Sequence, residues 1–161
     1  MHPVRKENRL ADYNYSQPGA YFITVCTKDR ANILSTIVGG DAHIAPCIAL
    51  TPVGKTAEKY IKTIPGIDCY AIMPNHVHMI LRISAKDARL GPVWEDAPVE
   101  ASIPSLVRSW KTLVSKELGK SIWQRSYYDH IIRDERDYII KAQYIANNPA
   151  KWHDDDYFSD G

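Results

Sequence analysis

The feature that most constrains the fold is a run of ten residues, 74–83, with the sequence PNHVHMILRI. Successive side chains of an extended strand point to opposite faces, so this run predicts a strand over residues 76–83 that follows a tight turn. One face carries only apolar side chains, those of Val77, Met79, Leu81 and Ile83. The opposite face carries His76, His78, Ile80 and Arg82. The apolar face must pack against another layer of the protein.

The two histidines are the first candidate functional residues. A single histidine on a strand is more often a hydrogen-bonded structural residue than a ligand. His76 and His78 stand at i and i+2, so their imidazoles lie side by side on one face. This arrangement favours a metal or phosphate site.

The composition is that of one globular domain over residues 1–161. The chain is 45% hydrophobic and 24% charged, and no apolar run approaches the roughly 18 residues of a membrane span. The N-terminus has no apolar signal-peptide core, and the three cysteines are scattered. These features suit a reducing cytoplasm. Within the domain we expect an N-terminal arm (1–19), a flexible loop (84–102) and an acidic tail (153–161).

Charge is unevenly distributed along the chain. The net charge is only +1, but residues 101–152 carry nine Lys or Arg against five Asp or Glu. Such a segment is compatible with a surface that binds phosphates, and equally with an ordinary solvated surface. The candidate phosphate contacts are Arg108, Lys111, Lys116, Arg125 and Arg133.

The pattern of apolar residues predicts the order of the elements. Strands are expected at 20–27, 67–73, 76–83 and 128–133, with 32–38 extending the first strand as a hairpin. Helices are expected at 51–64, 103–118 and 134–148. The order is that of an α+β, ferredoxin-like (split βαβ) sandwich, in which an antiparallel sheet has two helices on one face. The extra C-terminal helix is then the element left to cover the histidine face.

That helix carries Tyr144 and Asn148, which are four residues apart and share one face. Asn148 would equally serve as a helix C-cap, and Tyr144 as a packing residue. Beside the histidines, however, an amide oxygen would complete a shell of nitrogen and oxygen ligands that suits Mg²⁺ or Mn²⁺ and does not exclude Zn²⁺. A tyrosine next to a metal-bound phosphodiester could act as a nucleophile.

Four motifs in register resemble the single-tyrosine HUH transposases, and most closely the branch of REP-associated tyrosine transposases. They are YFIT at 21–24, MPNHVH at 73–78, the segment from WQR to DHIIR at 123–133, and YIANNP at 144–149. The resemblance covers residues 10–152.

This resemblance implies a bacterial, metal-dependent single-strand DNA endonuclease and strand transferase. His76 and His78 would match the metal ligands of the HUH motif, and Asn148 the third ligand. Tyr144 would match the nucleophile that forms a 5′-phosphotyrosine link. Imperfect DNA hairpins would be the partners, and because some relatives act as dimers, a homodimer is one expectation.

Two alternatives from other classes remain open on the sequence. One is a non-catalytic nucleic-acid-binding module that uses exposed aromatic and basic residues. The other is a metallohydrolase that uses the histidine pair and an activated water without a tyrosine.

Overall fold

The computed structural model describes residues 19–40, 43–83 and 102–160. Its elements are β1 (Gly19–Cys26), η1 (Lys28–Arg30), β2 (Ser35–Val38), β3 (Cys47–Leu50), α1 (Pro52–Ile61), β4 (Ile67–Ile72), β5 (His76–Ile83), α3 (Ile103–Leu118), β6 (Tyr128–Ile132), α4 (Glu135–Asn147) and η2 (Pro149–Asp154). The N-terminal arm expected at 1–19 and the flexible loop expected at 84–102 fall, but for their last residues, outside the described part of the chain.

Four strands form one antiparallel sheet in the order β4-β5-β1-β6. The two central strands, β5 and β1, are paired along their whole length, and the register sets Thr24 opposite His78 and Cys26 opposite His76. The expected α+β class and four-stranded antiparallel sheet are confirmed. The predicted histidine strand is a central strand, so both of its edges are hydrogen-bonded to neighbouring strands.

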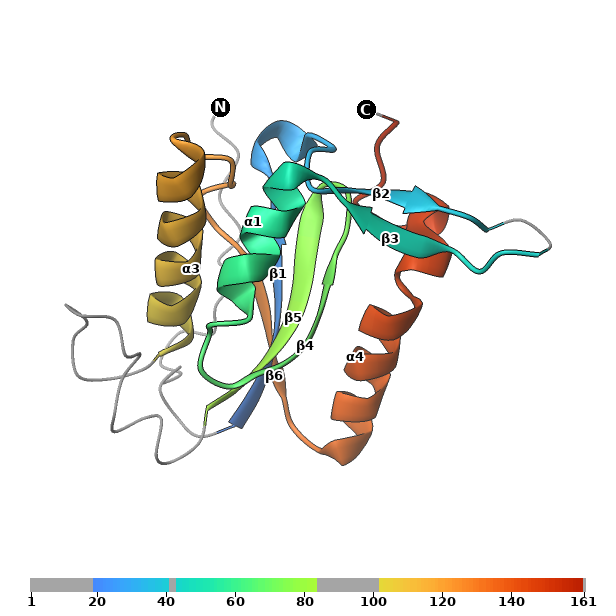
Figure 1. Ribbon diagram of the computed structural model, residues 1–161. Helices are drawn as coiled ribbons and strands as arrows, with labels where there is room; N and C mark the ends of the chain where they lie inside the picture. The colour runs from blue at the N-terminus through green and yellow to red at the C-terminus, as the bar shows by residue number, and fades with distance from the viewer. Residues whose placement is uncertain (1–18, 41–42, 84–101, 161) are drawn as a thin grey trace, which may run out of the picture.

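One face of the sheet is covered by α1 and α3 (Figure 1). The apolar side chains of β5 that face this layer, from Val77 to Ile83, all belong to the main core. Trp110 of α3 is fully buried there, and its indole Nε1 donates to the carbonyl oxygen of Ala57 at 3.1 Å. The alternation in the sequence therefore separates the packed face of β5 from its histidine face, as predicted.

The ends of both core helices follow from local sequence. Thr51 caps α1 by accepting a hydrogen bond from Gly54 N, and Pro52 occupies the first helical position, where its missing N–H costs nothing. Ser102 and Ser105 form a reciprocal capping box at the start of α3. Gly119 ends α3 in the left-handed conformation that glycine adopts without strain.

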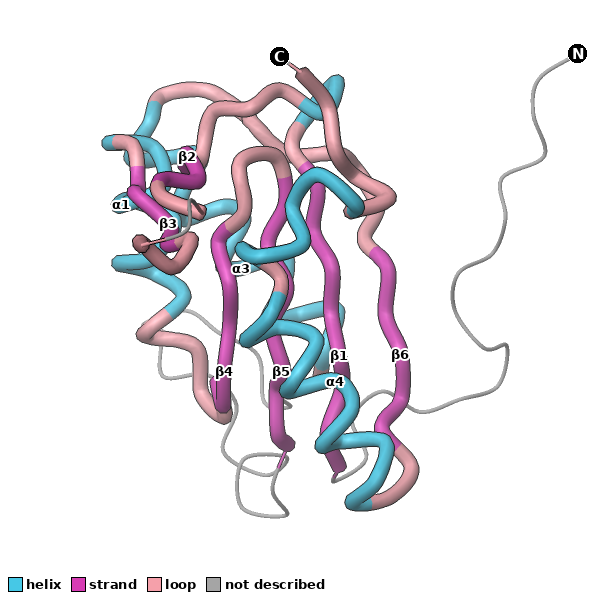
Figure 2. The backbone as a smooth tube through the Cα atoms, turned by 90° about the vertical axis from the view of Figure 1, so that its right-hand side faces the viewer, coloured by secondary structure: helices cyan, strands magenta, loops and turns pink. Residues whose placement is uncertain are grey.

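Helix α4 lies across the other face of the sheet (Figure 2). A small second cluster joins it to the strands, made of Phe22, Ala71, Ile80 and Ile145. Ile145 is the one fully buried residue of α4. The histidine face is therefore covered by a helix that buries little of its own apolar surface.

The expected extension of the first strand over 32–38 is wrong. Beyond Cys26 the chain turns through η1, where Asp29 and Arg30 take positive φ angles of 56° and 53°, and this turn carries the chain away from β1. Residues 35–38 become β2, which pairs with β3 in a separate two-stranded ribbon. The ribbon is fixed to the sheet by Ser35, whose hydroxyl donates to Ile72 O at 2.8 Å. Among the described helices, none is long and apolar enough to cross a membrane.

We predict that Gly54→Ala lowers the free energy of unfolding by about 3 kcal/mol, because a Cβ atom there would overlap the carbonyl oxygen of Leu34. Gly119→Ala is the matched control. It adds a methyl group where no atom lies within 4 Å. Its free energy of unfolding should fall by only about 1 kcal/mol, the cost of a residue with a Cβ atom in the left-handed conformation. Urea unfolding of both variants measures the difference, and equal losses would contradict the close packing of α1 on residue 34.

Candidate functional site

The histidine pair is buried at the start of β5. The rings of His76 and His78 lie 4.5 Å apart between centroids, and both side chains are almost completely buried. Each ring is held through Nδ1. His76 Nδ1 lies 2.8 Å from Asn75 Oδ1, and His78 Nδ1 lies 2.7 Å from Thr24 Oγ1 on β1. These contacts orient both Nε2 atoms away from the strand that carries them.

Asn75 fixes the tautomer of His76. Its amide nitrogen donates to the carbonyl oxygen of Tyr157 at 2.6 Å, so its oxygen is the atom that faces His76. A carbonyl oxygen only accepts, hence Nδ1 of His76 carries the proton and Nε2 carries a lone pair. Among the residues that the structure describes, neither Nε2 of His76 nor Nε2 of His78 has a hydrogen-bond partner.

Helix α4 brings Tyr144 to this pair. Its ring meets His78 edge-on at 5.2 Å and Phe22 at 6.0 Å. Tyr144 is 42% exposed, whereas both histidines are buried. Solvent or a ligand can therefore reach the tyrosine side chain. Burial of part of the ring raises the pKa of the phenol, Asp155 raises it further, and the side chain of Asn148 lowers it.

Asn148 follows α4 and points into the same site. Its side chain is only 2% exposed. The amide nitrogen donates to Asp155 Oδ2 at 3.1 Å, while Oδ1 has no hydrogen-bond partner within the described part of the chain. Tyr144 and Asn148, one helical turn apart, thus both lie beside the histidines.

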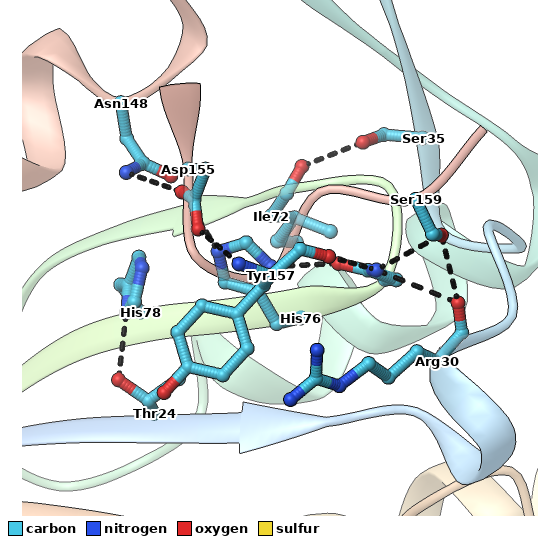
Figure 3. A network of polar contacts seen from close by, with 11 residues as sticks. Thr24, Arg30, Ser35, Ile72, His76, His78, Asn148, Asp155, Tyr157 and Ser159 are labelled. Atoms are coloured by element: carbon cyan, nitrogen blue, oxygen red, sulfur yellow. Dashed lines mark hydrogen bonds and ion pairs between the residues drawn. The ribbon is translucent and has the colours of Figure 1, made fainter. Parts of the chain in front are cut away.

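Asp155 is a site residue that sequence reasoning missed. Its carboxylate lies 3.7 Å from His76 Nε2, and His76, His78 and Asp155 offer ligand atoms that all lie within 4.8 Å of one another (Figure 3). The expected acidic tail at 153–161 is therefore, over its described residues, part of the site. The one sequence signal was the pair of aromatic residues at 157 and 158, which is unusual in a solvated acidic tail.

The rest of the tail folds over the histidines. The ring of Tyr157 lies 4.7 Å from that of His76, and the guanidinium of Arg30 lies 5.6 Å from the centre of the Tyr157 ring. The hydroxyl of Ser159 contacts the carbonyl oxygen of Arg30 (Figure 3). It also lies 3.2 Å from Asn32 Oδ1. The segment after η2 therefore closes the end of the site that faces η1.

Polar contacts attach the start of α4 to the sheet. The carboxylate of Asp137 lies 2.8 Å from His130 Nε2 on β6. The hydroxyl of Tyr138 donates to Asp68 Oδ2 at 2.6 Å, and the guanidinium of Arg82 stacks on the Tyr138 ring at 4.5 Å. These contacts orient the helix that carries Tyr144 although its apolar contact with the sheet is small.

The donor set fits a divalent metal ion. Burial lowers the pKa of His76 to about 4, with Asp155 and Asn148 acting in the opposite direction, and burial lowers that of His78 well below its usual value. Both imidazoles are therefore neutral near pH 7, as metal ligation requires. Two imidazole nitrogens, an amide oxygen and a carboxylate are compatible with Mg²⁺, Mn²⁺ or Zn²⁺.

Four of the five predicted phosphate contacts lie together. Arg108, Lys111, Lys116 and Arg125 line an open cavity of about 900 Å³ beside α3, which we call the basic groove. Lys28 and Lys120 also line it. Lys111 already donates to Gln124 O at 2.8 Å. Arg133 lies apart, in a second cavity with Arg82 and Tyr138.

Comparisons with known proteins agree with this fold. No protein-family model matches the chain. An uncharacterized protein of Haemophilus influenzae is 33% identical over 97% of this chain and 94% of its own length. A second H. influenzae protein, with the provisional name REP-associated tyrosine transposase, is 24% identical over 86% of this chain and 74% of its own. The REP-associated tyrosine transposase of Escherichia coli K12 is 28% identical over 53% of this chain and 44% of its own.

A solved structure, that of a REP-associated tyrosine transposase bound to a REP hairpin, has the same fold. It matches with a TM-score of 0.59 and 21% identity over 89% of this chain and 73% of that one. The two named relatives and the shared fold together indicate the transposase family. The chain belongs to the family of REP-associated tyrosine transposases.

The depressed histidine pKa values predict an acid-sensitive fold. The unfolded chain takes up protons at the ordinary histidine pKa of 6.5, whereas folded His76 does so only near 4. The unfolded state therefore binds more protons as pH falls, and we expect His76 alone to remove about 3 kcal/mol of stability between pH 6.5 and 4.

Urea unfolding from pH 7.5 to 4.5 measures this loss. His76→Gln should reduce the pH dependence. A slope unaffected by His76→Gln would show that another group causes the acid sensitivity.

Proposed function

We propose that the protein is a metal-dependent single-strand DNA endonuclease and strand transferase that acts at hairpin-associated sites. Tyr144 is the nucleophile and forms a covalent 5′-phosphotyrosine intermediate. The observation that carries the proposal is the juxtaposition of an accessible tyrosine with three buried ligand atoms that have no hydrogen-bond partner in the described chain, His76 Nε2, His78 Nε2 and Asn148 Oδ1. Membership in the transposase family supports the same reading.

His76, His78 and Asn148 hold the divalent ion, Mg²⁺ or Mn²⁺, and the carboxylate of Asp155 lies close enough to His76 to join them. When bound, such an ion polarises a phosphodiester and offsets its negative charge. Asn75 keeps the proton of His76 on Nδ1, which leaves Nε2 free to ligate. Thr24, on the neighbouring strand, holds the ring of His78 in place through Nδ1.

Tyr144 performs the bond exchange. The phenolic oxygen gives up its proton to solvent and forms a bond to the scissile phosphorus. The bond from phosphorus to the 3′ oxygen of the preceding nucleotide breaks, and that oxygen takes up a proton to leave as a 3′-OH. Attack by a different 3′-OH reverses these steps and joins two strands, so no external energy source is needed.

The DNA partner is a hairpin with a single-stranded flank. The structural relative was solved with a REP hairpin, and in this chain the basic groove supplies six cationic side chains. Groove and site are close along the chain, because Thr24 of β1 contacts His78, and Lys28, at the start of η1 just after β1 ends, lines the groove. The duplex occupies the groove while the single strand reaches Tyr144.

The architecture proposed with this activity is a ferredoxin-like sandwich. The strand order β4-β5-β1-β6, with α1 between β1 and β4 and α3 between β5 and β6, supports it. The whole chain, residues 1–161, acts as one catalytic domain, alone or as a homodimer.

The decisive experiment is formation of a covalent adduct. A labelled hairpin oligonucleotide with single-stranded flanks, selected from a randomised pool for binding to the protein, is incubated with Mn²⁺ and denatured before electrophoresis. We expect a protein–DNA adduct with the wild type and a loss of roughly a thousandfold or more with Tyr144→Phe, which binds DNA unchanged. Tyr128→Phe, which changes an exposed tyrosine on β6, is the matched control and keeps the adduct.

Other outcomes of the same gel would identify a different class of protein. Cleavage without an adduct indicates a metallohydrolase, and binding in EDTA without cleavage indicates a binding module. His76→Ala and Asp155→Asn should both reduce Mn²⁺ binding in calorimetry. Full adduct formation by His76→Ala with Mn²⁺ present would remove the ligand role.

The basic groove makes a separate prediction about salt. Each duplex phosphate contact contributes about 0.9 to the slope of log affinity against log salt. Replacing Lys116 and Arg125 with Gln should therefore lower the slope by nearly 2 and weaken binding of all hairpins alike. Replacing Lys55 and Lys62 with Gln, at exposed positions on α1 and its C-cap, is the charge-matched control; if it gave the same change in slope, the groove would not be the DNA-binding surface.

A further inference from the structure

Lys141 is a cation beside the site that the sequence analysis did not single out. It is half-buried on α4, three residues before Tyr144, and therefore on the same face of the helix. Its Nζ lies 5.1 Å from the centre of the Phe22 ring. That ring in turn stacks on His78 at 5.2 Å, so Lys141, Phe22 and His78 form one row across the sheet.

The ammonium group of Lys141 has no ion pair among the described residues. The nearest acidic residue on its own helix, Asp137, is engaged by His130 Nε2 at 2.8 Å and by Arg133 N at 3.2 Å. The cation–π contact with Phe22 stabilises this position by only about 0.5–1 kcal/mol. A half-buried ammonium held this loosely remains available to an anion.

Its position differs from that of the other cation near the histidines. Arg30 lies at the His76 end of the row, where the Tyr157 ring covers its guanidinium. Lys141 lies at the His78 end, next to the exposed phenol of Tyr144. Of the two, Lys141 is the one that an incoming strand meets together with the nucleophile.

We infer that Lys141 binds a non-bridging oxygen of the DNA phosphate that lies next to Tyr144. The inference rests on the proposed function, because it assigns a contact to the single strand in that site. A flexible ammonium suits this task, since it follows the phosphate as a point charge while Phe22 restrains its stem. Lys141 would thus add a second positive charge to that of a divalent ion held by the histidines.

The test measures binding in a Tyr144→Phe background, so that cleavage does not interfere. The probe is the selected hairpin oligonucleotide with its single-stranded flank. Lys141→Gln should weaken binding about tenfold, the value of a charged hydrogen bond, and lower the salt slope by about 0.7, the contribution of one single-strand phosphate. Lys141→Arg should retain most of the affinity, and Lys55→Gln should change neither quantity.

A phosphate scan then shows whether the contact is direct. Phosphates around the cleavage position are replaced singly by neutral methylphosphonates. At the contacted position the replacement should cost about tenfold more with Lys141 present than with Lys141→Gln. Equal costs at every position in both proteins, or a Lys141→Gln variant that behaves like Lys55→Gln, would overturn the inference.

The outcome is separable from that of the proposed function. Adduct formation by the wild-type protein tests the chemistry, and the binding cycle tests Lys141. A protein that forms adducts with no dependence on Lys141 retains the function and refutes the inference. Thermal unfolding of Lys141→Gln identifies any loss of fold, and in that case the comparison of Lys141→Arg with the wild type on the methylphosphonate series decides.

Discussion

The burial of two imidazoles on a central strand is the constraint on which the rest of the site depends. A buried ring nitrogen must be either neutral or paired. In this chain burial keeps both rings neutral, and contacts from Asn75 and Thr24 satisfy the Nδ1 atoms. The Nε2 atoms are left facing α4 and the segment after it. Tyr144, Asn148 and Asp155 all come from this helix and this segment, and they lie beside the two histidines.

Much of the fold could be predicted because its signals are local. β5 and α3 have the predicted bounds, since strict alternation marks the first and capping residues mark both ends of the second. The β2–β3 ribbon was missed because its pairing depends on η1, where two non-glycine residues take positive φ angles that no sequence pattern announces. The helix expected to reach residue 64 ends at Ile61, followed by turns that lead to Gly66, whose φ is 79°.

The residues of the candidate site also divide into those that a local pattern predicts and those that it does not. The histidines follow from period two, and the pairing of Tyr144 with Asn148 follows from helical spacing. Asp155 does not, because it reaches His76 across 79 residues of sequence through a short turn without periodicity. Lys141 was hidden for a different reason. Its importance comes from contact with Phe22, and nothing in its own neighbourhood distinguishes it from a solvated lysine.

Helix α4 combines polar attachment at its start with little apolar burial along its length. Its contacts through Asp137 and Tyr138 fix a direction, while Ile139 and Ile140 remain exposed. Such contacts are sensitive to geometry but contribute little net stability. The direction of the helix axis is thus fixed by polar contacts, while little apolar burial stabilises the helix on the sheet.

The short stretch of chain from Thr24 to Lys28 limits the distance between the candidate site and the basic groove. Thr24, under His78, and Lys28, at the basic groove, are separated by four residues of chain, and an extended strand advances about 3.3 Å per residue. The Cα atoms of these two residues are therefore at most about 13 Å apart, although β1 ends at Cys26 and Lys28 opens η1. A ligand held by Lys28 at the basic groove thus lies only a short, covalently limited stretch of backbone from the residue that contacts His78.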